Sequence, residues 1–150
     1  MGKYGSLLVF VLLVLAAALT GSLFKPGSWY ADLVKPSWTP PNWAFPVAWT
    51  TLYVMIAIAG WLAWRVERFG SATGFWATQL VLNAHWSWTM FGEHNIGWAF
   101  TVIVAMWFAI VGFIYSTWTI RRSAALLFVP YLAWVSYAAA LNFAIWRLNG

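Results

Sequence analysis

The charged residues of this chain are spaced so that five intervals of 21 to 29 residues carry no charge at all. A membrane-spanning helix needs about 20 apolar residues. An unpaired charge is costly in hydrocarbon and therefore collects at helix ends. The spacing predicts five transmembrane helices, near residues 5–24, 45–65, 72–91, 97–119 and 123–146.

The composition agrees with a membrane protein. Hydrophobic residues make up 63% of the 150 residues and charged residues only 7%, and the mean hydropathy is +0.75. Soluble domains carry about 25% charged residues. Apart from the first, the connections are short, so helices adjacent in sequence should pack antiparallel. We therefore predict an all-α integral membrane protein, a single five-helix bundle over residues 1–150.

The basic residues predict the orientation of this bundle. Five spans place the termini on opposite sides, so Lys3, Arg65, Arg68, Arg121 and Arg122 share the side of the N-terminus. Fewer basic residues lie on the other side, namely Lys25, Lys35 and Arg147. By the positive-inside rule, the N-terminus is expected to be cytoplasmic.

Two other interpretations of the basic and apolar residues are less favoured. The net charge of +5 is dispersed over helix ends and forms no stripe for nucleic acid. Lys3, an apolar run and alanines at 16–18 resemble a signal peptide. Since the run continues to Phe24, we interpret it as a helix.

The inventory of reactive residues excludes several chemistries. The three carboxylates, Asp32, Glu67 and Glu93, lie at predicted helix ends or in loops, so no buried acidic pair is available for acid and base catalysis. The same distribution disfavours a proton-coupled transporter. His85 and His94 have no second ligand at helical spacing, so no metal site is predicted. His94 is expected to be solvated and His85 to pack between helices. There is no cysteine.

Polar and aromatic residues recur at helical spacing. Gln79, Asn83, Trp86 and Ser87 share one face of the third predicted helix, which should point inward because lipid cannot satisfy an amide. The other faces are Trp49 with Tyr53 in the second helix, and Trp134, Ala138 and Asn142 near Tyr131 and Tyr137 in the fifth. Such residues either hold the bundle together or line a ligand site. Tryptophans near helix ends (Trp61, Trp64, Trp118 and Trp146) are expected at the membrane interface.

Several segments carry a resemblance to a known family. They are WYADLVKPSWTPP (29–41), PVAWTTLY (46–53), QLVLNAHWS (79–87) and VPYLAWVSYAAALNFAIWRLN (129–149). Together they closely resemble the TspO/MBR family, the tryptophan-rich sensory proteins that include the translocator protein, or peripheral-type benzodiazepine receptor. The resemblance implies five transmembrane helices, a homodimer, and a Trp/Pro-rich loop between helices 1 and 2 that folds over a pocket.

The resemblance also implies the ligands. They are tetrapyrroles such as protoporphyrin IX and haem, sterols, and benzodiazepine-type drugs, with no cofactor required. Carried over by motif position, the ligand-binding residues are Trp38, Pro40, Trp49, Tyr53, Asn83, Trp86, Trp134, Ala138 and Asn142. Trp49 and Trp134 are the pair to which light-dependent degradation of porphyrin would be assigned. Prolines 36, 40, 41 and 46 restrict the loop, which is expected to act as a preorganised lid.

Three functions remain open at this stage. The preferred one is a membrane receptor or sensor that binds porphyrins and modulates tetrapyrrole or stress responses. The alternatives are a light-dependent porphyrin-degrading enzyme and a facilitated translocator of tetrapyrrole or sterol. Phe143 stands where the family's sterol motif usually has tyrosine, which disfavours sterol binding. The small-residue faces Gly70, Gly74 and Thr78, and Ala105 with Ala109, are candidate dimer seams. A bacterial membrane is expected.

Overall fold

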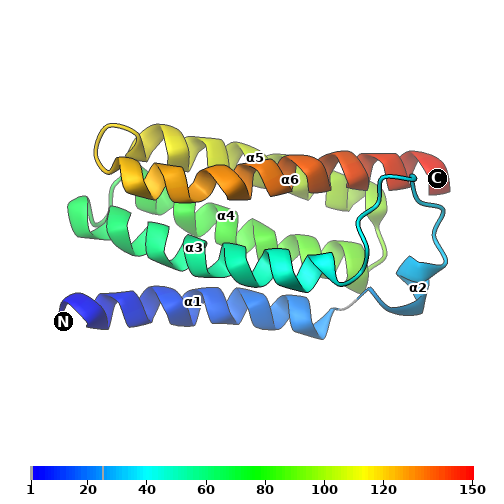
Figure 1. The fold of residues 1–150 in the computed structure, drawn as a ribbon, viewed down its shortest axis with the longest axis horizontal. Coiled ribbons are helices and arrows are strands. Elements are labelled where there is room, and N and C mark those ends of the chain that lie inside the picture. Colours follow the sequence, from blue (N-terminus) through cyan, green and yellow to red (C-terminus); the bar gives the residue numbers. More distant parts are fainter. Residues whose placement is uncertain (1, 25) are drawn as a thin grey trace.

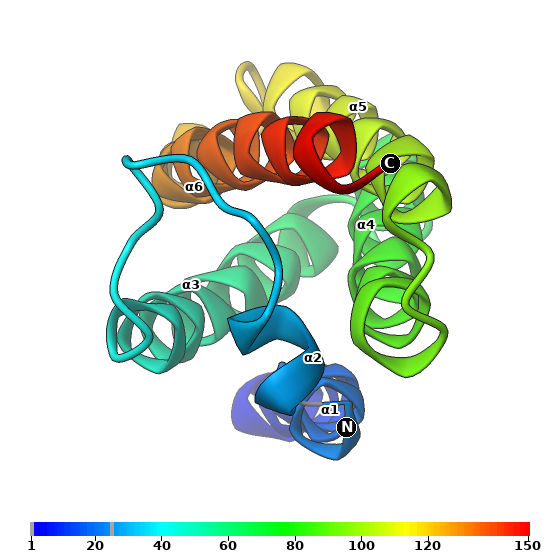
Figure 2. The same cartoon turned by 90° about the vertical axis from the view of Figure 1, so that its right-hand side faces the viewer.

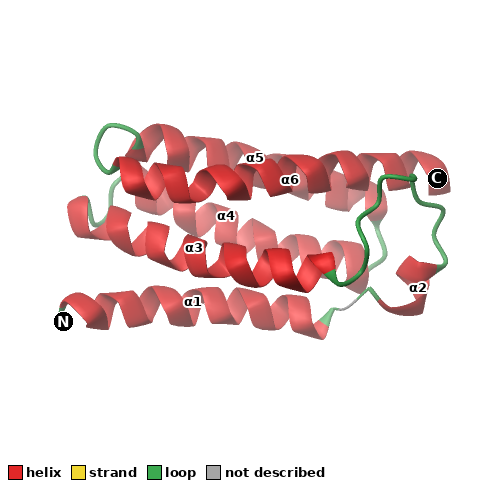
Figure 3. Cartoon of the chain, in the orientation of Figure 1, coloured by secondary structure: helices red, strands yellow, loops and turns green. Residues whose placement is uncertain are grey.

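The chain is folded into long helices, and the described residues contain no strand (Figures 1 and 3). The computed structural model describes residues 2–24 and 26–150. Lys25, one of the charges used above to predict orientation, lies outside this range. The elements in chain order are α1 (Lys3–Leu23), α2 (Gly27–Ala31), α3 (Ala44–Val66), α4 (Ser71–Ser87), the π-helical turn η1 (Trp88–Gly92), α5 (Ile96–Thr117) and α6 (Arg122–Asn149).

The five predicted spans are confirmed. Helices α1, α3, α5 and α6 are each long and apolar enough to cross a membrane. Helix α4 has only 17 residues, but η1 continues it without a break. The hydroxyl of Thr89 donates to the carbonyl of His85 at 2.8 Å, and the N–H of Glu93 donates to the carbonyl of Trp88 at 2.9 Å. Together α4 and η1 cover the predicted interval 72–91, and the protein is a multi-pass integral membrane protein.

The core lies between α3, α4, α5 and α6. The rings of Phe113 and Phe128, both fully buried, are 4.1 Å apart between α5 and α6. Trp76 of α4 packs against Gly60 of α3, where a Cβ would lie 2.4 Å from the indole nitrogen. That indole N–H donates to the carbonyl of Ile56 at 2.9 Å. Glycine at position 60 therefore allows α3 and α4 to approach closely.

Helix α1 lies at the edge of the bundle, beside α3 and α4 (Figure 2). Only Phe10, Val14 and Ala17 of its residues are buried, and their spacing places them on one face. Leu8, Leu12, Leu15 and Leu19 on the other faces are each more than half exposed. A lipid environment removes the cost that these leucines would have in water.

Residues 26–43, which we call the lid, connect α1 to α3. The lid begins with α2, a short helix that the sequence did not predict, and then passes by the end of α6 before it descends to α3 (Figures 1 and 2). The two termini lie at opposite ends of the bundle, as five spans require (Figure 1). The lid is at the end that also holds the C-terminus.

Candidate functional site

The lid is attached to α6 by three hydrogen bonds. The side-chain amide of Asn149 pairs with the backbone of Val34: the Val34 N–H donates to Oδ1 at 3.0 Å, and Nδ2 donates to the Val34 carbonyl at 2.8 Å. The hydroxyl of Tyr137 donates to the carbonyl of Trp38. The Trp38 ring also packs on Tyr137, with centroids 5.7 Å apart. The part of the lid that contains Val34 and Trp38 is therefore fixed against α6.

Lys35 stabilises the start of the lid. Its ammonium group donates to the carbonyls of Tyr30, Ala31 and Leu33 at 2.8 to 3.2 Å. Tyr30 and Ala31 are the last two residues of α2, where helical carbonyls lack the partners available in a helix interior, and Leu33 follows the helix. The same nitrogen lies 4.8 Å from the centre of the Tyr30 ring. Lys35, predicted only as a topology signal, thus has a structural role as well.

Beneath the lid, aromatic side chains of α3 and α6 pack against one another. Trp49 stacks on Tyr53, with centroids 5.6 Å apart, and meets Trp134 edge to face at 6.4 Å and 89°. Phe45 and Tyr137 each contact Trp134 with centroids 5.9 Å away. We call these five residues, Phe45, Trp49, Tyr53, Trp134 and Tyr137, the aromatic cluster. It brings together the two tryptophans that the sequence had singled out.

A hydrogen-bonded network of amides and tyrosines lies deeper in the bundle. Tyr53 donates to Oδ1 of Asn83 at 3.2 Å, and Nδ2 of Asn83 donates to the hydroxyl of Tyr131 at 3.0 Å. Tyr131 in turn donates to Oε1 of Gln79 at 2.7 Å, and Nε2 of Gln79 donates to the carbonyl of Trp76 at 2.8 Å. The predicted inward face of α4 is confirmed, because Gln79 and Asn83 are 0% and 2% exposed.

Trp86 and Asn142 form a separate pair. The indole N–H of Trp86 donates to Oδ1 of Asn142 at 2.9 Å, and Nδ2 of Asn142 donates to the carbonyl of Ile96 at 3.0 Å. Trp86 also contacts Phe91 of η1, with centroids 5.5 Å apart. Both polar groups of Asn142 are thus engaged within the protein, where they connect α4, α5 and α6.

One donor in the aromatic cluster has no partner. The indole nitrogen of Trp134 is buried, and no acceptor lies within hydrogen-bonding distance in the described part of the chain. The hydroxyl of Tyr30, in the lid, is in the same condition. A buried donor without an acceptor costs about 1–3 kcal/mol, so such groups in native proteins often mark a functional site.

The remaining predicted residues lie around the cluster. Trp38 is 45% exposed in the lid, and Pro40 follows it in the same segment. Ala138 packs against the main core one turn after Trp134. Two cavities, of about 660 and 450 Å³, lie elsewhere, and neither is lined by any of the nine predicted ligand residues. The aromatic cluster occupies the region beneath the lid, where the pocket was predicted.

The two histidines lie outside this region. The ring of His85 meets Trp88 at 5.3 Å, next to η1. His94, which was expected to be solvated, is exposed but also stacks on Trp29 of the lid, with centroids 4.1 Å apart and planes at 5°. His94 therefore connects the lid to the α4–α5 connection.

Several residues of the site were not predicted as ligand contacts. Tyr131 is the centre of the buried network and Tyr137 joins the lid to the cluster, whereas the sequence places them only near the polar face of the fifth predicted helix. Phe45 and Asn149 are not among the predicted site residues. The sequence does contain a signal for Tyr131, because its spacing of three residues to Trp134 and a further four to Ala138 places all three on one helical face. No pattern in the sequence indicates the pairing of Asn149 with Val34.

Known proteins resemble the chain over most of its length. Residues 10–147 match the TspO/MBR family. Protein CrtK of Rhodobacter capsulatus is 41% identical over 94% of this chain and 91% of its own, and the tryptophan-rich sensory protein of Cereibacter sphaeroides is 40% identical over 89% and 85%. The human translocator protein is 33% identical over 93% of this chain and 88% of its own. The chain therefore belongs to the TspO/MBR family.

Proposed function

We propose that the protein is a membrane receptor or sensor that binds a porphyrin-type ligand, such as protoporphyrin IX or haem, beneath the lid. The observation that carries the proposal is the buried indole N–H of Trp134, which has no acceptor although it lies within an aromatic cluster. A porphyrin offers flat apolar faces for indole rings and polar groups at its edge that accept hydrogen bonds. The names of two relatives, a sensory protein and a translocator protein, agree with such a role.

Binding requires the aromatic cluster to open. The Trp49 and Trp134 rings now contact each other edge to face, and Phe45 lies against Trp134. A planar ligand would replace these contacts with its own faces, so little apolar surface would be exposed on opening. The prolines of the lid limit its backbone freedom in both states, which reduces the entropic cost of closing over a ligand.

The two asparagines differ in what they can offer a ligand. Asn83 and Asn142 already donate and accept within the bundle. A ligand would therefore gain a hydrogen bond from either only by displacing an internal one. Trp134 breaks no internal hydrogen bond when it donates to a ligand, so we assign it the principal polar contact with the ligand. The asparagines instead position Tyr53 and Trp86.

The lid provides a means of signalling. The lid is attached at Trp38 to Tyr137 of α6, whose ring also contacts Trp134. A ligand that moves Trp134 would thereby shift the equilibrium between lid positions, to the extent that it binds one position more tightly than the other. The lid surface then differs between the free and bound protein, and a partner could recognise that difference.

Protoporphyrin IX binding in the dark tests this proposal. We expect saturable quenching of tryptophan fluorescence in detergent, and on the order of tenfold weaker binding in Trp134→Phe, which loses one hydrogen bond to the ligand. Trp118→Phe is the matched control, because Trp118 is 43% exposed at the opposite end of the bundle. Quenching that does not saturate, or equal weakening in both variants, would show that porphyrin only partitions into the micelle.

A light-dependent reaction is the second candidate function. The 6.4 Å separation of the Trp49 and Trp134 centroids favours it, because an indole in contact with an excited porphyrin can pass it an electron. The products would be an indole radical cation and a porphyrin radical anion, and dioxygen would be the oxidant for degradation. Loss of porphyrin absorbance under illumination in air, absent in Trp49→Phe and without oxygen, would support this reaction.

A translocator is the third candidate. The name of the human relative favours it, and facilitated movement of a tetrapyrrole needs no buried ionisable relay. Phe143, at the position that disfavours a sterol, is 43% exposed and contacts Phe100 on the outer side of the bundle. Flux of protoporphyrin IX into proteoliposomes, compared with empty liposomes, distinguishes translocation from binding alone.

Membrane orientation and assembly complete the proposal. We propose a bacterial membrane, a cytoplasmic N-terminus and a homodimer. Gly74 has open space around it and Thr78 is exposed, so this face of α4 is free for a second copy. The alternative face on α5 is less suitable, because Ala109 is only 5% exposed and already belongs to the core. Cross-linking through Gly74→Cys would detect the α4 seam.

A further inference from the structure

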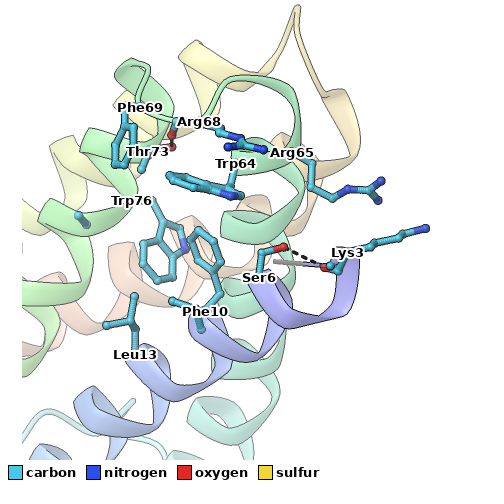
Figure 4. A pocket seen from close by; sticks show the side chains of 13 residues that line it. Lys3, Ser6, Phe10, Leu13, Trp64, Arg65, Arg68, Phe69, Thr73 and Trp76 are labelled. Atoms are coloured by element: carbon cyan, nitrogen blue, oxygen red, sulfur yellow. Dashed lines mark hydrogen bonds between the residues drawn. The ribbon is translucent and has the colours of Figure 1, made fainter.

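A groove of about 660 Å³ lies at the end of the bundle opposite the lid, between α1, α3 and α4. Its inner walls are aromatic and aliphatic, and Figure 4 shows the rings of Phe10, Trp64 and Trp76 gathered there. Leu13 is 46% exposed and Phe69 is 89% exposed, so the groove communicates with the outside of the bundle. It is unrelated to the aromatic cluster beneath the lid.

The mouth of the groove is basic. Lys3, Arg65 and Arg68 all line it, and no aspartate or glutamate does. All three groups lie over aromatic rings. The Arg65 guanidinium is 5.2 Å from the centre of the Trp61 ring, that of Arg68 is 6.0 Å from Trp64, and the Lys3 ammonium is 5.5 Å from Tyr4. In Figure 4 the Lys3 and Arg65 side chains extend away from the aromatic walls in the same direction.

Nearby polar groups leave the cations available. Glu67 lies between the two arginines in sequence. Its carboxylate packs against the backbone of Gly70, so closely that a Cβ added at position 70 would be 1.5 Å from Oε1. The hydroxyl of Thr73 donates to the carbonyl of Arg68 at 2.6 Å, and Ser6 donates to the carbonyl of Lys3 at 2.9 Å. These bonds satisfy backbone carbonyls at the rim, while the arginine N–H groups keep their capacity to bind an anion.

The position of the groove in the membrane indicates which kind of anion it can bind. Lys3 begins α1 and Arg65 lies in the last turn of α3, so the basic mouth is at the level of lipid headgroups and the apolar walls are at the level of acyl chains. A phospholipid with a negative headgroup has the same arrangement of charge and apolar surface. Lipids with zwitterionic headgroups lack the net charge that three unopposed cations favour.

We propose that this groove is a binding site for one anionic phospholipid per protomer. The phosphate and headgroup contact Arg65, Arg68 and Lys3, and an acyl chain lies along Phe10, Leu13 and Trp76. Binding would hold α1, which buries only three residues of its own, against α3 and α4. The site is independent of porphyrin binding, and either proposal can fail without the other.

Native mass spectrometry of the delipidated protein tests the site. Dioleoyl phosphatidylglycerol and dioleoyl phosphatidylcholine, which share their acyl chains, are added separately at equal concentration. We expect one phosphatidylglycerol per protomer, retained on the order of tenfold more strongly than phosphatidylcholine. Arg65→Gln with Arg68→Gln should abolish this preference, and the two lysine replacements at the same positions should keep most of it.

Two further variants separate the groove from general surface charge. Arg121→Gln with Arg122→Gln removes the same charge at the same end of the bundle but outside the groove, and should leave the preference unchanged. Ala77→Trp keeps every charge and fills the apolar wall from an exposed position, so it should lower retention. Circular dichroism confirms that each variant is folded.

Several results would overturn the site. Equal loss of phosphatidylglycerol in the two glutamine pairs would assign the preference to diffuse surface charge, and full retention in Ala77→Trp would place the lipid elsewhere. Absence of a preference in the unmodified protein would also refute the proposal. If protoporphyrin IX, an apolar macrocycle with two carboxylates, were retained through Arg65 and Arg68 while phosphatidylglycerol was not, the occupant would be the macrocycle.

Discussion

Asn149 and Val34, 115 residues apart in the chain, are joined by two hydrogen bonds between one side-chain amide and one backbone unit. The amide thus pairs with the Val34 backbone in the way that two residues pair in an antiparallel β-sheet, and it attaches the lid to the last turn of α6. Neither residue is predicted to contact a ligand. Position 149 therefore tests the closure of the lid separately from the chemistry beneath it.

Replacing Asn149 with alanine should loosen the lid. The two hydrogen bonds to Val34, of about 1 kcal/mol or less each at an exposed site, are lost together with one to the Ile145 carbonyl within α6. Hydrogen exchange at the Val34 amide should therefore accelerate on the order of tenfold. Asn149→Asp keeps an acceptor for the Val34 N–H and should preserve most of the protection. An unchanged exchange rate in Asn149→Ala would mean that the pair contributes nothing to lid closure.

Adding a methyl group at Gly60 should destabilise the bundle. Alanine usually stabilises a helix by about 1 kcal/mol relative to glycine, but here the new Cβ would lie 2.4 Å from the Trp76 indole and 2.9 Å from Phe10. Both rings would have to move, at a cost of about 1–3 kcal/mol for overpacking. We expect a lower thermal unfolding midpoint in detergent.

Gly21→Ala is the control for the substitution at position 60. The nearest atom to a Cβ at position 21 would be Oγ of Ser87, at an ordinary van der Waals distance of 3.7 Å, so the same change in α1 should be neutral or slightly stabilising. If both alanine variants unfold at the same temperature as the parent protein, α3 and α4 are not packed as closely as the structure has them.

Removing the hydroxyl of Tyr131 should damage the buried network. In Tyr131→Phe, Oε1 of Gln79 loses its donor and Nδ2 of Asn83 loses its acceptor. An unpaired polar group costs about 1–3 kcal/mol when fully buried, although bonds between membrane helices average only about 0.6 kcal/mol. We expect a loss of about 1–2 kcal/mol in the free energy of unfolding, between these two limits.

Tyr53→Phe gives the comparison within the same network. It removes only the bond to Oδ1 of Asn83, and Tyr53 is only partly buried, so a smaller loss of stability is expected. Equal losses in the two variants would contradict the central position of Tyr131. The measurement is reversible unfolding in mixed micelles, with circular dichroism as the signal.

Tyr30 should make the lid sensitive to alkaline pH. Burial, and to a smaller extent the charge of Tyr137, raises the pKa of the Tyr30 phenol above its ordinary value of 10.0. Because the folded lid binds the proton more tightly than the unfolded chain does, this contribution is complete below pH 10 and is lost as the pH rises through the higher, folded-state pKa. The lid should therefore be less stable at about pH 11 than at about pH 9.

Tyr30→Phe should remove this alkaline loss. It also deletes a buried hydroxyl that has no partner among the described residues, so the lid should gain about 1 kcal/mol or less at neutral pH. Limited proteolysis of the lid at several pH values measures both effects. Proteolysis that depends on pH identically in the two proteins would exclude Tyr30 as the titrating group.

The sequence alone determined the class of protein and the course of its chain. Charge spacing and apolar length are local properties, and a membrane admits few structures that satisfy them. The five spans, the inward face bearing Gln79 and Asn83, and the Trp/Pro-rich connection could therefore be predicted. The limits of α6 were predicted to within a few residues, at 123–146 against Arg122–Asn149.

Only the tertiary structure decided which of these residues meet. Helical spacing shows that Asn83 and Tyr131 point inward, but whether they bond to each other depends on the rotation and axial shift of α4 against α6. Those quantities result from packing over the whole interface, including the close approach of Trp76 to Gly60. The unpartnered indole of Trp134, the pairing of Asn149 with Val34, and the basic groove beside α1 all depend on this relative placement, and no local pattern in the sequence encodes it.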